Sequence, residues 1–524
     1  ETLPEIKNLV EVDYEEMIPL TSCEAALAEG APAIHEKGNI LSHEHLVRGN
    51  AEEVLENSAF VVTEHYSVPI NEHAFMEPEC AIAQPEGEGI LLFSAGQSIY
   101  DEQREVARML GLDKEKIHVQ SKLVGGGFGG KEDMSVQHHA SLAAWLLKKP
   151  VKVLLSREES LMVHPKRHGM EMDFTTGCDE EGNLTAMKAV IYADTGAYAS
   201  LGGPVLQRAC THAAGPYKYQ TIDVEGFAVY TNNPPAGAFR GFGVCQTAFA
   251  IESNLNLLAE KVGLSPWEIR FKNAVAPGDT LPNGQLVSKN AALKEALLAV
   301  KDVYEQAEVA GISSFFKNSG VGVGLPDTGR CIISVEEGKI HVRTSAACIG
   351  QGMATVTTQI ACETLNLPPE MIVAEAPDTR RTPNSGTTTA SRQSLFTGEA
   401  TRRAAMQLRY ELDMGRALSD LEGEEFYGEY SAKTDPLIND KKSPVSHAGY
   451  GYAAEVAILD DKGKVAKFVA AYDMGQVVNP RAAEGQIEGG IAMGMGYALT
   501  EKFALEEGYV KAKYATLGLV NATQ

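Results

Sequence analysis

Residues 125–132 read GGGFGGKE, and this stretch fits two phosphate-binding motifs without completing either of them. A Walker loop requires Ser or Thr after its lysine to hold Mg²⁺, whereas Glu132 follows Lys131 here and would repel a triphosphate. A dinucleotide fingerprint requires an acidic residue about 20 residues further on, and Glu158 and Glu159 lie too far along the chain. What remains is a glycine-rich backbone that a large ligand can approach closely, with an aromatic ring and a carboxylate beside it.

The composition is that of an ordinary globular protein with room for two or more domains. Of its 524 residues, 44% are hydrophobic and 22% are charged. The formal net charge of −24 argues against nucleic acid as a partner and is interpreted as favouring solubility. The eight cysteines form no C-x-x-C or C-x₄-C-x₂-C pattern, which disfavours a zinc or iron–sulfur site in the chain and suits a reducing cytoplasm.

Neither a signal peptide nor a membrane span is predicted. The chain opens without a basic segment followed by an apolar one. Its most apolar stretch, residues 487–499, reads IEGGIAMGMGYAL and is too short to cross a bilayer. The glycines in that stretch predict a buried helix packed tightly on a neighbour or a ligand. The expected protein is therefore soluble and cytoplasmic, with no membrane partner.

Helices and strands are mixed along the whole chain. Apolar spacing predicts helices closed by Gly111 and Gly263 and another from about Ser135 to Leu147. β-rich runs at 151–155 and 189–193 predict strands. The turn-rich residues 275–290, VAPGDTLPNGQLVSKN, predict a linker and a domain boundary near 275–310.

Two kinds of motif suit a polar ligand with many atoms. Gly-Gln pairs at 96–97, 350–351 and 485–486 combine a tight turn with an amide that both donates and accepts hydrogen bonds. Residues 387–393, TTTASRQ, precede a predicted helix at 398–412 and offer an anion site. An ordinary turn or helix cap is the alternative for each motif taken alone.

Residues 238–243, AFRGFG, place a cation among aromatic and small residues. Arg240 could hold a phosphate or a carboxylate, and Phe242 could stack on a flat ring, although two Phe residues in an apolar segment usually belong to the core. The group around His73 matches no metal-ligand spacing, so we predict a hydrogen-bonded structural histidine and no side-chain metal ligand. The same prediction applies to the pairs His138/His139 and His164/His168.

Taken together, the motifs resemble the molybdenum-binding part of the xanthine oxidase family of molybdenum hydroxylases. Six motifs follow the family's order: GQS at 96, GGGFGGKE at 125, AFRGFG at 238, GQG at 350, TASRQ at 389 and EGQIEGG at 484. Residues 425–436, EFYGEYSAKTDP, look most like the bacterial selenium-dependent xanthine dehydrogenases. The resemblance implies an α+β, multi-domain molybdenum-binding fold of the xanthine dehydrogenase/aldehyde oxidase type.

The resemblance also implies how the chain is divided and what it works with. Residues 1–60 would be the remnant of an N-terminal α/β domain, 61–290 a first molybdopterin-binding domain and 291–524 a second one, incomplete at its C-terminal end. Molybdenum would be carried by molybdopterin, as its cytosine dinucleotide in a bacterial enzyme, with a sulfido or a labile selenido ligand. The 2Fe-2S clusters and FAD would lie in missing segments or partner chains of an oligomer.

The resemblance assigns roles in the cofactor site. Gln97 would hydrogen-bond an oxo ligand of molybdenum, and Gly127, Phe128 and Gly129 would lie against the metal end. The remaining cofactor contacts would come from Arg240, Gln351, Ala390, Ser391, Arg392, Gln393 and Gln486. Protein ligands to the metal are not expected.

On the substrate side, purine-oxidising members of the family carry a Glu after the glycine run and an Arg downstream, where aldehyde-oxidising members have less polar residues. Glu132 and Arg208 fill these positions, and Phe242 would stack on the purine. The implied reaction is oxidation of xanthine or hypoxanthine with water as oxygen source and iron–sulfur partners as electron acceptors. Ordinary structural ion pairs are the alternative for Glu132 and Arg208.

Three other functions stay open or are disfavoured. A hydroxylase of the same fold could act on an aldehyde or on a nicotinate-like heterocycle. A non-catalytic fragment is the second possibility, because the family's general base, a Glu in a G-x-G-E context, has no counterpart in these residues. A P-loop NTPase is disfavoured by Glu132.

Overall fold

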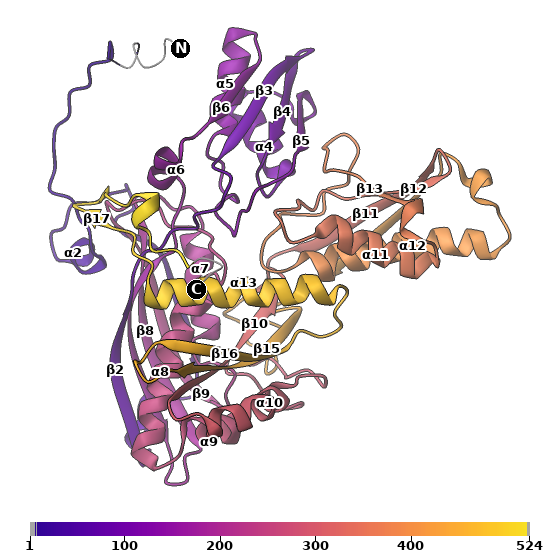
Figure 1. Cartoon of the computed structure of the whole chain (residues 1–524). Coiled ribbons are helices and arrows are strands. Elements are labelled where there is room, and N and C mark those ends of the chain that lie inside the picture. Colours follow the sequence, from indigo (N-terminus) through magenta and orange to yellow (C-terminus); the bar gives the residue numbers. More distant parts are fainter. Residues whose placement is uncertain (1–5, 7, 521–524) are drawn as a thin grey trace.

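The computed structural model describes residue 6 and residues 8–520. Three lobes meet around α13 (Pro480–Leu499), the long helix at the centre of Figure 1. Each lobe combines β-sheet with packed helices, which confirms the prediction of an α+β fold. Within the described ranges, no helix is long and apolar enough to cross a membrane.

The largest sheet has five strands in the order β1-β9-β8-β7-β2, with β8 and β9 parallel and the other neighbours antiparallel. The strands are β1 (Ile40–Arg48), β2 (Phe60–Val68), β7 (Gly169–Cys178), β8 (Leu184–Gly196) and β9 (Thr221–Tyr230). Alternate residues of β8, among them Ala189 and Ile191, face the core under α7 (Gly202–His212) and α8 (Val244–Val262). β1 comes from the range 1–60 and is nevertheless an edge strand of this sheet.

The upper lobe of Figure 1 is a four-stranded sheet in the order β5-β4-β3-β6. Its elements are β3 (Cys80–Glu86), β4 (Gly89–Ser94), α4 (Ile99–Leu110), β5 (Ile117–Ser121), α5 (Gln137–Leu147) and β6 (Val151–Leu154). The predicted helices before Gly111 and over 135–147 are confirmed, and Gly111 closes α4 at φ 66°, a left-handed conformation that suits glycine. The glycine run lies between β5 and α5.

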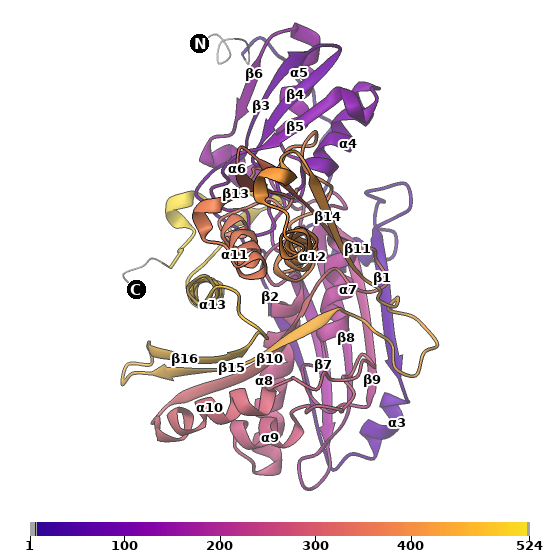
Figure 2. The same cartoon turned by 90° about the vertical axis from the view of Figure 1, so that its right-hand side faces the viewer.

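A third sheet, with antiparallel order β10-β15-β16, lies below α13 in Figures 1 and 2. Its strands are β10 (Ala310–Ser319), β15 (Gly449–Leu459) and β16 (Val465–Asp473). Helix α10 (Leu293–Gln306) covers the face turned away from α13. Trp267 of α9 (Pro266–Asn273) joins this core and donates to the carbonyl of Leu297 at 2.9 Å.

The remaining lobe holds a four-stranded sheet in the order β13-β12-β11-β14. Its elements are β11 (Asp327–Glu336), β12 (Lys339–Arg343), α11 (Met353–Leu365), β13 (Ile372–Ala374), α12 (Gln393–Asp413) and β14 (Glu425–Ala432). A Cβ on Gly428 would lie 2.0 Å from the carbonyl oxygen of Ala400, so α12 approaches β14 closely because of this glycine. Helix α12 begins five residues before the predicted start at 398.

The predicted linker at residues 275–290 is buried in a core and is not an exposed connection. The segment is irregular, but Val275, Leu281 and Val287 are at most 4% exposed and pack into the core under α10. Backbone groups of the segment form hydrogen bonds with one another. For example, the N–H of Val287 donates to the carbonyl of Asp279 at 2.8 Å. Turn residues indicate an irregular backbone, and whether that backbone is buried depends on the neighbours it meets.

The prediction of a buried helix at 487–499 is half correct. The stretch is helical, as part of α13, but only Gly496 of that helix is buried. A Cβ on Gly485 or Gly494 would meet nothing within 4 Å, whereas one on Gly489 or Gly490 would lie 3.4 or 3.6 Å from the guanidinium of Arg240. The pair Gly485-Gln486 is accordingly helix, and the turn predicted there is wrong.

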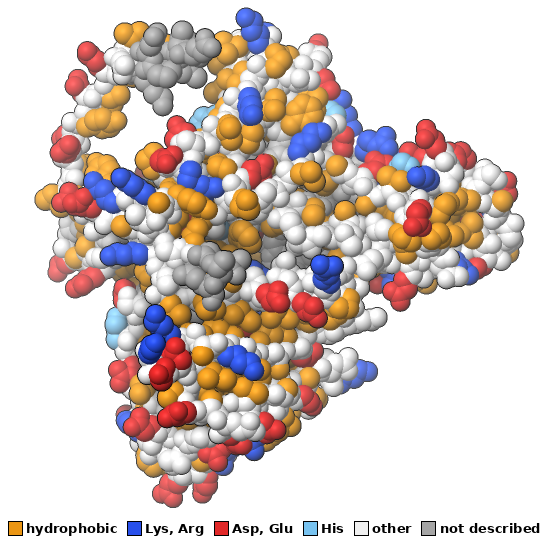
Figure 3. All heavy atoms as spheres, viewed as in Figure 1, with side chains coloured by type: hydrophobic (Ala, Val, Ile, Leu, Met, Phe, Trp, Pro, Cys, Tyr) orange, Lys and Arg blue, Asp and Glu red, His pale blue; other side chains and the backbone are white. Residues whose placement is uncertain are grey.

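The remaining short elements lie at the edges of the lobes. They are α2 (Cys23–Leu27), α3 (Ala51–Glu56), α6 (Arg157–Val163), β17 (Leu505–Glu506) and β18 (Tyr509–Val510). On the face drawn in Figure 3, acidic and basic side chains are interspersed.

Candidate functional site

Gln97 joins the glycine run to the segment before α12. Its side-chain amide donates to the carbonyl of Thr388 at 2.7 Å and accepts from the N–H of Gly129 at 3.1 Å. Its backbone N–H donates to the carbonyl of Lys131, and its carbonyl accepts from the N–H of Thr388, both at 3.0 Å. The side chain is 1% exposed and keeps one N–H and one oxygen lone pair for a ligand.

The glycines of residues 125–132 are required by close approaches. A Cβ on Gly127 would lie 2.6 Å from Oε1 of Gln97, and one on Gly129 would lie 2.7 Å from the carbonyl oxygen of Ala238. Two residues after Ala238, the backbone N–H of Arg240 donates to the carbonyl of Phe128 at 2.8 Å. The glycine run and residues 238–243 are thereby held side by side.

Four of the predicted site residues have a left-handed backbone although none is glycine. Phe128, Phe242, Ala390 and Ser391 have φ between 48° and 53°. Such conformations are strained for residues with a Cβ and concentrate at ligand sites. The strained backbone of these four residues is therefore typical of a ligand site and does not stabilise the loops themselves.

These loops also present unused backbone donors. Within the part of the chain that the structure describes, no hydrogen bond uses the N–H groups of Gly127, Phe128, Gly350, Gln351, Gly352, Ala390 and Ser391. Clustered free N–H groups attract oxygen-rich anions. The donor set fits a molybdopterin, whose pterin, phosphate and metal end are rich in acceptors.

Three arginines in the same region lack a carboxylate partner. We call Arg167, Arg208 and Arg240 the unpaired cations, because none forms an ion pair with any described residue. Arg240 donates to the carbonyl of Gln486 at 2.5 Å, and Arg167 donates to the carbonyl of Arg240 at 2.9 Å. Buried or half-buried positive charge without a counter-charge is unfavourable unless a ligand supplies one.

Glu132 and Arg208 each contact one of two segments that are hydrogen-bonded to each other, residues 389–391 and 320–321. The Glu132 side chain is hydrogen-bonded to Thr389. The carbonyl of Ala390 accepts from the N–H of Gly320 at 3.0 Å. The carbonyl of Val321 accepts from Nη2 of Arg208 at 2.5 Å. We call these two segments the paired turns.

Burial sets the charge of both side chains. It raises the pKa of Glu132 to about 8, with a smaller contribution from Asp133 and Asp101. The carboxyl is then protonated at neutral pH and can donate a hydrogen bond. Burial lowers the pKa of Arg208 to about 10, so this group stays positive.

The other predicted residues have partners within the chain or are exposed. Phe242 packs against the core beside α7, and Gly243 next to it approaches the Val205 carbonyl so closely that a Cβ would lie 2.5 Å away. The side chain of Gln351 bonds within its own turn, to Ile349 and Ala347. The side chain of Arg392 donates to Asp327, that of Gln393 donates to Thr388, and Gln486 is exposed.

Sequence reasoning missed several residues of the site. Arg167 lies over the ring of Phe239 at 3.7 Å and donates to Sγ of Cys245 at 3.0 Å. His447 contacts Arg208. The adjacent cations Lys166 and Arg167 offered a weak signal, whereas His447 lies in no recognisable motif.

A second group of buried charges lies behind the glycine run. We call Glu72, Glu79, His164 and Lys166 the paired cluster. Glu72 lies 2.8 Å from His164 Nε2 and 2.7 Å from Lys166 Nζ, and Glu79 lies 3.2 Å from His164 Nδ1. Although burial alone would raise it, the two cations hold the pKa of Glu72 well below its usual range.

His73 adjoins this cluster and confirms the prediction of a hydrogen-bonded structural histidine. It donates through Nε2 to the carbonyl of Ala238 at 2.8 Å and stacks on Phe239. Glu72, His73 and His164 are close enough together to share a metal ion. Lys166 already supplies the cation that Glu72 requires, so the arrangement favours a structural role.

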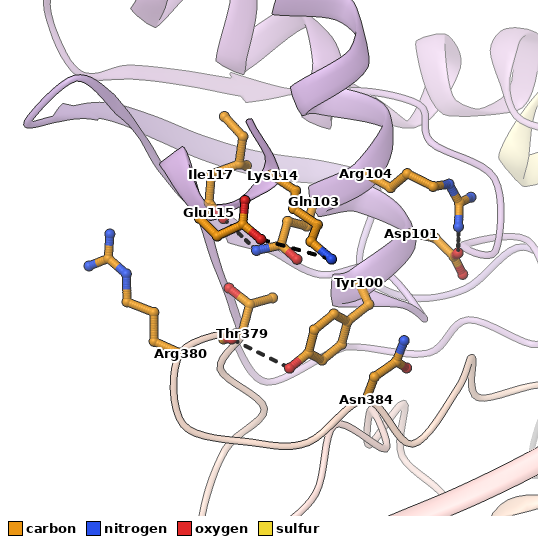
Figure 4. Close-up of a pocket in the computed structure, with 10 residues that line it drawn as sticks. All are labelled: Tyr100, Asp101, Gln103, Arg104, Lys114, Glu115, Ile117, Thr379, Arg380 and Asn384. Carbon is orange, nitrogen blue, oxygen red and sulfur yellow. Dashed lines mark hydrogen bonds and ion pairs between the residues drawn. The ribbon is translucent and has the colours of Figure 1, made fainter. Parts of the chain in front are cut away.

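A separate hollow of about 530 Å³ lies between α4 and residues 379–384 (Figure 4). Tyr100 closes one side by donating to the carbonyl of Thr382 at 2.5 Å. Two of its arginines are already paired, Arg104 with Asp101 of the same hollow and Arg380 with Glu86 outside it. No predicted site residue lines this hollow, so it is not where the motifs converge.

Comparison with known proteins gives a consistent result. Models of a molybdopterin cofactor-binding domain match residues 34–274, and 288–432 with 414–517. A probable xanthine dehydrogenase subunit from Bacillus subtilis is 34% identical over 551 residues, covering 97% of this chain and 74% of its own length. The nicotinate dehydrogenase large molybdopterin subunit of Eubacterium barkeri is 39% identical over 308 residues, 59% of this chain and 72% of its own length.

Among solved structures, the aldehyde oxidoreductase from Desulfovibrio gigas has the same fold. It superposes with a TM-score of 0.88 at 27% identity over 95% of this chain. The chain spans only 58% of that protein.

Proposed function

Because the chain belongs to the xanthine oxidase family of molybdenum hydroxylases, we propose that it binds molybdopterin and a purine, which is oxidised with water as oxygen source. The bound molybdenum centre would supply the two-electron oxidation and send the electrons to iron–sulfur partners. One observation carries the purine assignment, namely that Glu132 and Arg208 each contact one of the paired turns.

The cofactor would be held mainly by backbone. The free N–H groups of Gly127 and Phe128 would meet the metal end, and those of Ala390 and Ser391 the pterin and phosphate. Gln97 would use its remaining N–H toward an oxo group. Arg240 would balance negative charge, since it has no carboxylate of its own. The uncompensated cations support this assignment.

The substrate would be recognised through its polar edge. Protonated Glu132 and the Arg208 guanidinium both donate hydrogen bonds, and xanthine offers exocyclic oxygens and ring nitrogens that accept them. Phe242 would stack on the ring. An aldehyde without those acceptors would leave buried polar groups unpaired, which disfavours it.

The test compares two substrates in the complete enzyme with its partners. Glu132→Val together with Arg208→Met should lower kcat/KM for xanthine by about a hundredfold or more, since a site built to hydrogen-bond its substrate discriminates strongly. The same pair of changes should preserve or raise kcat/KM for a flat aromatic aldehyde. Molybdenum content is measured in each variant, with Lys116→Ala as a surface control. An unchanged ratio of the two constants would remove the purine assignment.

A nicotinate-like substrate is the second candidate, favoured by the 39% identity to the nicotinate dehydrogenase subunit. A pyridine carboxylate would place its negative charge against the unpaired cations. The parent enzyme decides between the two: a kcat/KM for nicotinate above that for xanthine selects the heterocyclic acid. Preference for the aldehyde over both would select aldehyde oxidation instead.

A further inference from the structure

His447 lies against Arg208 although the residues are 239 positions apart in the chain. Nε2 of His447 contacts Nη1 of Arg208, and the two residues are 0% and 4% exposed. A guanidinium can only donate, so Nε2 must be an unprotonated acceptor. The imidazole is therefore uncharged and carries its proton on Nδ1.

The other side of the imidazole is fixed as well. Nδ1 lies 2.9 Å from the hydroxyl of Tyr450, which accepts from Nδ2 of Asn283 at 2.9 Å. The backbone of His447 makes two hydrogen bonds with the side-chain amide of Gln285, at 3.0 and 2.9 Å. The buried irregular segment 275–290 thus orients the ring. The hydroxyls of Tyr450 and Ser446, both 2.9 Å from Nδ1, can accept its proton, and the guanidinium of Arg208, which can only donate, sets the tautomer.

This arrangement does not neutralise the positive charge of Arg208. Its guanidinium donates to the Val321 carbonyl and to the imidazole, and both acceptors are neutral. Burial, with Arg208, His212 and Lys317 nearby, holds the pKa of His447 well below its usual range. Arg392 shows the other solution, because its guanidinium is paired with the carboxylate of Asp327 at 2.5 Å.

We propose that His447 is a positioning residue for Arg208, which fixes the guanidinium with an uncharged acceptor and leaves its positive charge to the substrate. A carboxylate at this position would orient the guanidinium equally well and would neutralise it. The inference rests on the proposed function, because it takes Arg208 as the group that meets the polar edge of the substrate.

The experiment is a double-mutant cycle in the complete enzyme. The variants are Arg208→Met, His447→Leu and both together, and the readout is kcat/KM for xanthine relative to a flat aromatic aldehyde. His447→Leu should lower this ratio about tenfold to a hundredfold, as for loss of a hydrogen bond to a charged group, and mainly through KM. The double variant should be no worse than Arg208→Met alone.

Two further variants separate positioning from simple packing. His447→Gln keeps a neutral acceptor and should recover most of the loss, whereas His447→Glu keeps an acceptor but cancels the charge and should not. The dissociation constant for urate, which has no ring carbon left to hydroxylate, gives the same comparison without turnover. Molybdenum content confirms that each variant is loaded.

The outcomes distinguish the two proposals. If Arg208→Met leaves the ratio unchanged, the purine assignment fails, and an effect of His447→Leu would then act independently of Arg208 and overturn the positioning role too. If Arg208→Met lowers the ratio but His447→Leu does not, or the two effects add, the positioning role fails while the function stands. Equal activity of the Gln and Glu variants would overturn the part played by charge.

Discussion

The paired cluster and the unpaired cations show two opposite ways of burying charge in one molecule. In the paired cluster, Lys166 and His164 each lie within 3.2 Å of a carboxylate, and both are 0% exposed. Around the paired turns, Arg208 is 4% exposed and meets only neutral groups. The first region is electrically complete, whereas the second becomes complete only when an anionic or strongly polar ligand binds.

Burial alone does not distinguish a structural cation from a ligand-binding one. The presence or absence of a carboxylate partner does. Both groups contain cations within apolar surroundings, and each supports a loop next to the glycine run. Only the group without carboxylates would be stabilised by binding an anionic or strongly polar ligand. Each of the following predictions tests that distinction.

The largest effect is expected in the paired cluster. Glu72→Gln removes the carboxylate between His164 and Lys166 and leaves two buried cations with only Glu79. Breaking a buried ion pair in this way should lower the free energy of unfolding by about 3–5 kcal/mol. Urea titration of the cofactor-free protein measures it, with Lys116→Ala as a control that loses only an exposed ion pair with Glu88 and should shift by less than about 1 kcal/mol. A loss below about 1 kcal/mol would mean that the cluster is not a stabilising unit.

The next effect concerns cofactor loading. Arg240→Ala removes an unpaired cation and should weaken molybdopterin binding about tenfold to a hundredfold, the range for a hydrogen bond to a charged group. Phe242→Ala should leave molybdenum content unchanged and raise KM for the substrate. Metal analysis after equal expression compares them, and equal molybdenum in both variants and the parent would refute the role of Arg240.

A smaller effect is expected for Arg208 in the cofactor-free protein. Arg208→Met removes an uncompensated charge and also two hydrogen bonds, so the opposing terms should leave the stability within about 1.5 kcal/mol of the parent. The same urea titration applies. A loss as large as that of Glu72→Gln would show that Arg208 is structural after all.

A separate effect is a change in pH dependence. Glu132 binds its proton in the folded state up to pH about 8 but releases it near its ordinary value of 4.5 when unfolded. Stability should therefore fall as pH rises between these values, because the folded state holds the extra proton. Glu132→Gln should flatten this slope, while Glu102, whose burial raises its pKa to about 7, contributes equally in both proteins. Melting temperatures at pH 5 and pH 8 test it, and parallel curves would contradict the raised pKa.

Helices could be predicted from the sequence because the signals for them lie in neighbouring residues. The spacing of apolar residues together with Gly111 and Gly263 located α4 and α8. The resemblance assigned residues of the glycine run and of 238–243 to one cofactor site, and the close approach of Gly129 to Ala238 explains why both motifs are rich in small residues.

What the sequence could not supply was the identity of neighbours. The burial of the segment 275–290 and the exposure of α13 could not be predicted, since turn residues and apolar glycines do not say what covers them. Arg208 could be singled out, but its partner His447 required the fold to bring two distant segments together. The absence of carboxylates around a cation is likewise a property of the assembled site.

The Gln97 amide carries a consequence for biosynthesis. Its two side-chain bonds reach residues 32 and 291 positions away, across two lobes. Closing so long a loop has an entropic cost that is offset only when both lobes are already formed, so this junction should be among the last to assemble. A cofactor that requires the finished junction can bind only chains that have completed folding, and by mass action it then holds them there. Loading of the cofactor would in this way act as a checkpoint on folding, separating mature molecules from those still exposed to proteolysis.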